Sequence, residues 1–144
     1  MFSKACEYAI RAVVCLAACG VEGERLSLTE IAERTDSPEA FTAKILQKLV
    51  HAGLVHSVKG PGGGFEISAA SARKVALSQI VSTIDGDGIY TGCALGLPQC
   101  NATKPCPVHD HFLRIREDLR TMLEGTTVSD LVSGLRTGET FLKR

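Results

Sequence analysis

The sequence lacks a long apolar run, a net charge and an export signal. No stretch of about 18 uninterrupted apolar residues occurs, so we expect no membrane-spanning helix. The N-terminal segment carries Glu7 and Arg11 where a signal peptide would need its apolar region. Basic and acidic residues number 16 each, so the net charge of the whole chain gives no indication of a nucleic-acid partner. We therefore expect a cytoplasmic protein with no membrane partner.

The sequence also lacks the signatures of a catalytic or nucleotide-binding site. The glycine-rich run 60–64 is followed by Phe65 and Glu66, whereas a phosphate-binding loop continues with Gly-Lys-Ser or Gly-Lys-Thr. No Ser-His-Asp arrangement has supporting motif context, and no pair of carboxylates has the signature of acid–base catalysis. We therefore do not expect an enzyme.

What is present is the pattern of a winged helix. Apolar residues recur every three or four positions, which predicts helices over 3–18, 28–35 and 39–52. Ser27 and Glu30 form a capping box before the second helix, and Gly53 is placed to end the third. Short strands at 54–58 and 65–68 flank a glycine-rich turn. This order predicts a mainly α fold with a small β-hairpin wing, a winged helix-turn-helix.

Charge is distributed unevenly along this pattern. From Ala40 to Phe65 there is no aspartate or glutamate, while Lys44, Lys48 and Lys59 are present. A neutral protein with one basic segment can still offer a phosphate-binding face, although chance clustering is the alternative. The wing glycines would let the backbone approach phosphate or the minor groove.

The second half of the chain predicts a helix at 77–84, an irregular segment at 89–107, a long helix at 108–124 and a short helix at 127–135. The long helix carries an apolar stripe, which fits a dimer interface or packing on its own domain. We expect one domain over 1–135 and a frayed tail over 136–144. Within that domain we distinguish a DNA-binding part at 1–70, a helix and cysteine loop at 71–107 and a dimerisation helix at 108–124.

Six cysteines fall into two groups. Cys15 and Cys19, in the first helix with Cys6, share a face, and we interpret them as small buried side chains rather than metal ligands. The second group has the spacing Cys93-x6-Cys100-x5-Cys106, in a loop with glycine and proline. Soft thiolates suit an iron–sulfur cluster, zinc or copper, and a disulfide or no ligand are further alternatives.

A fourth ligand would complete that second group. His109 is nearest in sequence, three residues after the last cysteine. Glu7 is an alternative, since a dimer can bring the first helix of one subunit to the loop of the other. His111 is a weaker candidate.

Three segments carry a resemblance to a known family. They are Glu7-Tyr8-Ala9-Ile10-Arg11, Leu28-Thr29-Glu30-Ile31-Ala32, and Gly53-Leu54-Val55 through Lys59-Gly60-Pro61-Gly62-Gly63-Gly64-Phe65. They resemble the Rrf2 family of winged-helix transcriptional regulators, over roughly residues 1–135, and the wing is the most specific piece. Cys93, Cys100 and Cys106 stand where the cluster-binding IscR, NsrR and RirA members keep three cysteines, which the cysteine regulators lack.

The resemblance implies a homodimeric repressor on a double-stranded DNA operator, whose affinity depends on an iron–sulfur cluster. The signal would be cluster status, redox state or nitric oxide. By position, the DNA-binding residues would be Phe41, Thr42, Lys44 and Lys48 in the recognition helix and Lys59, Gly60 and Gly62 in the wing. The resemblance also suggests that Lys59 enters the minor groove.

The sequence departs from the family pattern in two places. Ala43 stands where biogenesis regulators carry glutamate, and the first cysteine gap is one residue longer than usual. The Cys106-x2-His109 ending resembles the 2Fe–2S biogenesis regulators, whereas an acidic residue at Glu7 resembles the 4Fe–4S nitric-oxide sensors. We favour 2Fe–2S with His109. The alternatives are a zinc or thiol-switch regulator on the same fold, and a cluster-carrying or protein-interaction module that does not bind DNA.

Overall fold

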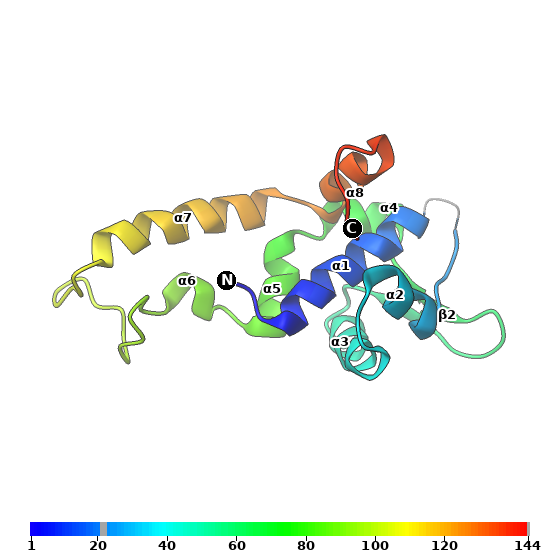
Figure 1. Ribbon diagram of the computed structural model, residues 1–144, viewed down its shortest axis with the longest axis horizontal. Coiled ribbons are helices and arrows are strands. Elements are labelled where there is room, and N and C mark those ends of the chain that lie inside the picture. The colour runs from blue at the N-terminus through cyan, green and yellow to red at the C-terminus, as the bar shows by residue number, and fades with distance from the viewer. Residues whose placement is uncertain (21–22, 144) are drawn as a thin grey trace.

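The computed structural model describes residues 1–20 and 23–143, and it is mainly helical with one antiparallel hairpin (Figure 1). This confirms the predicted winged helix-turn-helix class. In chain order the elements are α1 (Lys4–Cys19), α2 (Leu28–Thr35), α3 (Glu39–His51), β1 (His56–Val58), β2 (Gly64–Glu66), α4 (Ala69–Lys74), α5 (Leu77–Asp85), α6 (Gly88–Thr91), α7 (His109–Gly125) and α8 (Val128–Thr137).

Helix α1 runs through the middle of the core. It begins at Ser3, whose hydroxyl accepts a hydrogen bond from the Cys6 amide at 3.1 Å. Ala9, Ala12 and Val13 are fully or almost fully buried, and α1 contacts α2, α3, α5 and α8. Because these side chains are small, several helices approach one central helix closely.

The ends of α2 and α3 are set by capping residues. The predicted capping box is present: the Ser27 amide donates to the Glu30 carboxylate at 2.8 Å, and the Glu30 amide donates to the Ser27 hydroxyl at 3.2 Å. Asp36 ends α2 in the left-handed conformation, with φ 51°. Gly53, with φ 76°, lies just beyond α3 as the sequence predicted.

The hairpin is shorter than predicted. Its register pairs His56 with Glu66 and Val58 with Gly64. The predicted strand residues Leu54 and Val55 instead donate their amides to the Leu49 carbonyl, so they complete the end of α3. Likewise Ser68 caps α4, a six-residue helix too short to show an apolar period in the sequence.

Helix α7 extends away from the rest of the molecule, and only its C-terminal end packs on α5 through the fully buried Leu123 (Figure 1). We call α6, the loop 92–108 and α7 the arm, and α1–α5, α8 and the wing the head. None of the described helices combines the length and apolarity that crossing a membrane requires.

Helix α8 extends two residues beyond the predicted end at 135, and the chain then turns back toward the head. Helix α8 packs on α1 and α4 and continues to Thr137. The Glu139 and Thr140 amides donate to the Gly134 carbonyl at 3.0 and 3.1 Å, which turns the chain back. Leu142 then packs against the core, and the Lys143 ammonium reaches the Glu33 carbonyl at 3.4 Å.

Candidate DNA-binding surface and cysteine site

One side of α3 presents basic and polar side chains to solvent. Lys44 and Lys48 are exposed and lie one helical turn apart. Gln47 and His51 line the same hollow beside them, and neither was named as a candidate from the sequence. Their spacing from Lys44, three and seven residues, is the helical period that could have identified them.

Phe41 lies at the start of this surface and is 38 % exposed. Its ring packs edge-on against Tyr8 with the centroids 5.8 Å apart. The Arg11 guanidinium in turn lies 4.7 Å from the Tyr8 ring centroid and donates to the Thr35 carbonyl at 2.9 Å. Phe41 is thus accessible but held in place by α1.

Thr42 does not belong to the accessible surface, which corrects the sequence prediction. Its side chain is 1 % exposed. Its hydroxyl donates to the Pro38 carbonyl at 2.9 Å and lies 2.6 Å from the Ser37 hydroxyl. Because a buried hydroxyl with two partners is unavailable to a ligand, Thr42 stabilises the turn between α2 and α3 instead.

The wing places Lys59 and Gly60 at an exposed tip. Gly60 and Gly62 adopt positive φ angles of 88° and 72°, which explains glycine at both positions. Arg25 supports the hairpin from the side, because its guanidinium contacts the Glu66 carboxylate at 3.0 Å and the Gly62 carbonyl at 3.5 Å. Sequence reasoning did not identify Arg25, since it precedes α2 and lies far from the wing in sequence.

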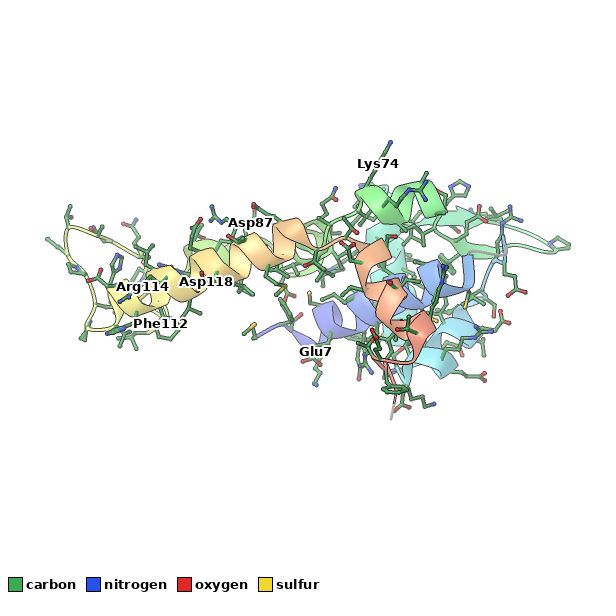
Figure 2. All side chains as sticks on the ribbon, turned by 90° about the horizontal axis from the view of Figure 1, so that it is seen from above. Glu7, Lys74, Asp87, Phe112, Arg114 and Asp118 are labelled. Carbon is green, nitrogen blue, oxygen red and sulfur yellow. The ribbon has the colours of Figure 1, made fainter. Side chains whose placement is uncertain are left out.

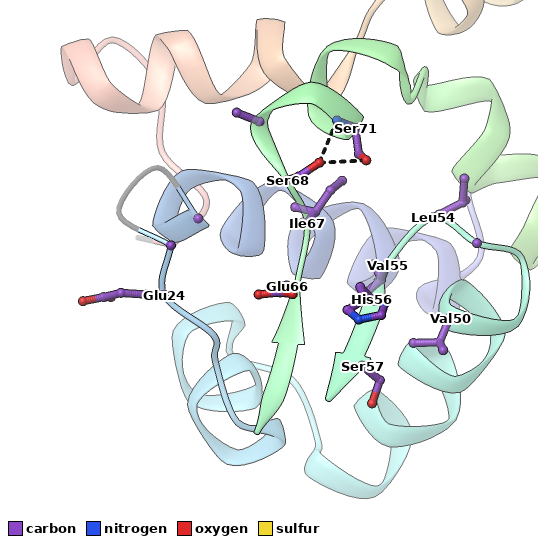
Figure 3. A pocket seen from close by; sticks show the side chains of 14 residues that line it. Glu24, Val50, Leu54, Val55, His56, Ser57, Glu66, Ile67, Ser68 and Ser71 are labelled. Carbon is purple, nitrogen blue, oxygen red and sulfur yellow. Dashed lines mark hydrogen bonds between the residues drawn. The ribbon is translucent and has the colours of Figure 1, made fainter. Parts of the chain in front are cut away.

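A hollow of about 800 Å³ lies at the root of the wing (Figure 3). Residues from the end of α3, both strands and the start of α4 line it, including Val50, His56 and Glu66. The Ser71 amide donates to the Ser68 hydroxyl at 3.0 Å at its edge. This lining contains no cysteine, so the hollow is separate from the predicted metal site.

The predicted ligands on the arm form two pairs. The Cys100 sulfur lies 3.4 Å from the Nδ1 atom of His109, which is the first residue of α7 and is buried. The Cys106 thiol lies near enough to the Cys93 sulfur to lower the pKa of Cys93. The predicted cysteine loop therefore brings Cys93 and His109, which are 16 positions apart, into one region of the arm.

The environment of Cys93 favours a thiolate. The backbone amides of Leu95 and Leu97, next to its sulfur, lower the pKa of Cys93 more than any other group. The Cys106 thiol and the Arg116 guanidinium lower that pKa further. Amide donors to sulfur are also the second-sphere groups that tune thiolate-ligated metal centres.

The donor chemistry fits a thiolate-ligated cofactor, although the ligands are not gathered round one point. Among the described residues, no three cysteine, histidine or acidic side chains are positioned to hold a single metal ion. The three thiols nevertheless lie in one loop, and the imidazole of His109 follows directly at the start of α7. An iron–sulfur cluster is an extended object, so its ligands need a wider arrangement than a single ion.

The other fourth-ligand candidates lie apart from these pairs. Glu7 is on α1 in the head, where the Lys4 ammonium contacts its carboxylate at 2.7 Å and lowers its pKa. Figure 2 shows it well away from Phe112, which is on the outer part of α7. Within one chain Glu7 does not join the cysteine loop. His111 is exposed on α7.

The N-terminal cysteines have a different character. Cys6 is fully buried, and burial with the neighbouring Asp85 raises its pKa to about 12. Burial raises the pKa of Cys15 to about 11, which fits its interpretation as a small core residue. Cys19 is only partly buried and accepts a hydrogen bond from Arg34 at 2.8 Å, so that interpretation fits it less well.

Helix α7 carries an uncovered apolar surface. Four large apolar side chains on it are between 39 % and 52 % exposed: Phe112, Leu113, Ile115 and Met122. The predicted stripe is therefore buried within the chain only at Leu123, with Leu119 half-buried. Apolar area of this kind is typical of a surface that another protein covers.

The chain is similar in sequence to known transcriptional regulators. The family model "Rrf2: Iron-dependent Transcriptional regulator" matches residues 2–134. A protein of Aquifex aeolicus (strain VF5) described as an HTH-type transcriptional regulator is 32 % identical, over 92 % of each chain. The regulator IscR of Pectobacterium carotovorum subsp. carotovorum (strain PC1) is 29 % identical over 88 % of this chain and 75 % of its own.

Solved structures share the fold. The cysteine regulator CymR of B. subtilis superposes with a TM-score of 0.75 at 22 % identity, covering 92 % of this chain and 96 % of its own. IscR of T. potens superposes with a TM-score of 0.74 at 20 % identity, covering 98 % of this chain and 92 % of its own. Both solved structures therefore have the same architecture as this chain.

Proposed function

Because this chain belongs to the Rrf2 family of transcriptional regulators, we propose that it binds operator DNA as a homodimer under the control of a cysteine-ligated iron–sulfur cluster. Membership of this family makes the chain a transcription regulator and not an enzyme. The observation that carries the finer proposal is the loop that holds three thiols and a buried histidine in two adjoining pairs. A DNA-binding regulator of this kind acts in the cytoplasm, on the chromosome.

The DNA-binding surface consists of the exposed side of α3 and the wing. Lys44 and Lys48 would contact phosphate at the edges of the major groove, with Phe41 packed beside them. Lys59 would reach the neighbouring groove, where Gly60 and Gly62 allow the backbone to approach closely. Support comes from the exposure of the three lysines and from the absence of acidic residues between 40 and 65.

The homodimer would form through α7. A second copy of the same helix would cover the exposed side chains of Phe112, Ile115 and Met122 by two-fold symmetry. Dimers of this kind present two recognition helices to successive major grooves, which explains why operators are roughly palindromic.

Cys93, Cys100 and Cys106 would hold the cluster, with His109 as the fourth ligand. His109 is favoured over Glu7 because its ring already contacts the Cys100 sulfur, whereas Glu7 would have to come from the partner subunit. The donor set of three thiolates and one imidazole suits 2Fe–2S, which we favour over 4Fe–4S. When bound, the cluster supplies a redox-active group that oxidants and nitric oxide can alter.

A physical connection links the arm to the reading helix. Helix α5 contacts α7 on one side and both α1 and α3 on the other. At its end the Asp85 carboxylate accepts hydrogen bonds from the amide and hydroxyl of Ser3. A shift of α7 on α5 would thus change how α3 is placed, and ligand chemistry in the loop would bias the DNA-bound arrangement.

The DNA-binding part is tested with the double variant Lys44→Ala/Lys48→Ala. We expect weaker operator binding, and a smaller slope of log affinity against log salt by roughly 0.9 per lost phosphate contact. Lys74→Ala is the matched control, since Lys74 is exposed on α4, on another side of the head (Figure 2). Unchanged DNA affinity in the double variant with an intact fold would contradict this surface.

The cofactor part is tested by purifying the protein without oxygen and measuring iron, sulfide, zinc and the visible spectrum. Iron equal to sulfide with broad absorption would support the cluster, and two or four irons per protomer would decide its type. A colourless protein with zinc, or with no metal after reconstitution, would contradict it.

A thiol switch is the second candidate function. The nearness of the Cys106 thiol to Cys93, whose pKa it lowers, favours it, because two neighbouring thiols can form a disulfide. In that case a metal-free protein would change its DNA affinity on mild oxidation, and dithiothreitol would reverse the change.

A further inference from the structure

Arg116 occupies an unusual place on α7. Its neighbours on that helix are largely exposed, whereas its own side chain is half-buried against the cysteine loop. One terminal nitrogen donates to the Gly92 carbonyl, and the other donates to the Cys100 sulfur at 3.2 Å. The side chain therefore joins the beginning of the loop to its middle.

The third nitrogen of Arg116 differs from the two terminal ones. Its Nε atom is buried and has no hydrogen-bond partner among the described residues. A buried donor without a partner costs free energy, so a native structure rarely retains one unless something else accepts the bond. Since Nε is on the same planar group that contacts Cys100, an acceptor at the thiols would satisfy it.

The charge of Arg116 also matches the loop. A guanidinium stays positively charged at any physiological pH and presents its donors in a fixed plane. A loop that supplies three thiolates concentrates negative charge, and the Cys93 sulfur is near enough to be affected by this cation. The other nearby arginines are differently engaged: Arg114 bonds to the Asp110 carbonyl of its own helix, and Arg120 lies over the Tyr90 ring.

We propose that Arg116 is the positioning residue of the cysteine loop: it fixes Gly92 and Cys100 on α7 before a cofactor enters, and directs its remaining donor and its charge at the ligand sulfurs. The part that concerns the cofactor rests on the proposed function, whereas the part that concerns the loop does not. A donor and a positive charge at the sulfurs stabilise the reduced, more negative state of a cluster, so Arg116 would raise its reduction potential.

The first experiment uses the full-length metal-free protein and compares Arg116→Gln with Arg114→Gln by hydrogen exchange. We expect amides between 92 and 106 to exchange several-fold faster in Arg116→Gln, since the loop loses both anchors. Arg114→Gln is the matched control, because that side chain is exposed two residues earlier on the same helix (Figure 2). Loop exchange equal to that of the wild type in Arg116→Gln would overturn the positioning role.

The second experiment measures the midpoint potential of the cluster in anaerobic protein by following its visible band. We expect Arg116→Gln to shift the midpoint potential to lower values. Arg116→Lys keeps the charge and should therefore keep most of the wild-type potential, and Arg114→Gln should leave the potential unchanged. Circular dichroism confirms the fold of each variant. An unchanged potential in Arg116→Gln would overturn the electrostatic role even where loop exchange is faster.

The two experiments also separate this proposal from the proposed function. A wild-type protein that takes up no cluster would contradict the cofactor assignment, and the exchange measurement would still decide whether Arg116 anchors the loop. A cluster-loaded wild type in which Arg116→Gln changes neither measurement would overturn only the proposal on Arg116.

Discussion

The head and the arm bury their apolar side chains to very different extents. In the head, Leu46, Leu49 and Ile80 are fully buried, and α1 is covered on most of its circumference. On the arm, Phe112 and Ile115 of α7 remain 39 % and 52 % exposed. The head therefore has a complete core of its own, whereas the arm leaves large apolar side chains uncovered within the chain.

The cysteines of the arm are more accessible than Cys6 in the head, and their rates of chemical modification should give the largest difference between the two parts. In metal-free protein at pH 7, we expect iodoacetamide to modify Cys93 on the order of a thousandfold faster than Cys6. Cys6 is fully buried and reacts only when the head unfolds, a state populated at about one part in a thousand or less. Peptide mass spectrometry over time measures both rates.

Denaturant is the control for that experiment, because all six cysteines should then react at similar rates. Equal rates in the native protein would show that the head opens readily and would remove the contrast.

Core substitutions give the next largest effect. Leu46→Ala should lower the free energy of unfolding by about 3 kcal/mol, because it leaves a cavity in the head. Ile115→Ala should cost about 1 kcal/mol or less, and its effect should depend on protein concentration, since it weakens the proposed dimer. Urea unfolding at several concentrations measures both. A large, concentration-independent loss for Ile115→Ala would show instead that α7 is stabilised within its own chain.

The head could be predicted well from the sequence because local rules determine it. The capping box at Ser27, the glycine at Gly53 and the helical period of α3 each act over a few residues, and the structure has all three. The ends of the hairpin were less predictable, because Leu54 and Val55 complete α3 rather than pair with a strand.

The misplaced and missed site residues depended on side-chain contacts that no sequence motif marks. Thr42 has the polar side chain of a DNA-binding residue, and only the position of Ser37 and Pro38 shows that it faces inward. Arg116 is 16 residues from the cysteine whose sulfur it contacts, and its spacing carries no motif. The ligand roles of Cys93, Cys100 and Cys106, and the division of the chain at 70, 107 and 124, stay predictions.

Alkaline pH should remove the contribution of the buried Cys15 thiol to the stability of the head. Burial raises the pKa of Cys15 to about 11, whereas an unfolded thiol loses its proton near pH 8.5 to 9. The folded state thus holds one more proton between pH 9 and 11. The stability that Cys15 contributes is fully present below pH 9 and is lost as pH rises toward 11.

The corresponding slope is about 1.4 kcal/mol per pH unit for one proton. Cys15→Ala should make the alkaline fall in unfolding free energy shallower by about this amount. Cys93→Ala should not make this fall shallower, because the pKa of Cys93 is lowered and its thiol therefore gains no extra proton on folding. Denaturant titrations at pH 8, 9, 10 and 11 would test this, and identical slopes in all three proteins would contradict the buried position of Cys15.

A substitution beside the wing should change the free energy of unfolding least, because the ion pair that holds the hairpin from the side is partly exposed. Arg25 contacts the Glu66 carboxylate at 3.0 Å, with 40 % and 28 % of the two side chains exposed. Ion pairs at such exposure contribute about 0.2 to 1 kcal/mol, so Arg25→Gln should change the unfolding free energy by less than 1 kcal/mol. The hairpin keeps its backbone pairing and the bonds between Leu26 and Phe65. Unfolding curves in low and high salt test this prediction. If Arg25→Gln lowered the free energy of unfolding by more than 2 kcal/mol, the wing, unlike the arm, would be an integral part of the core of the head.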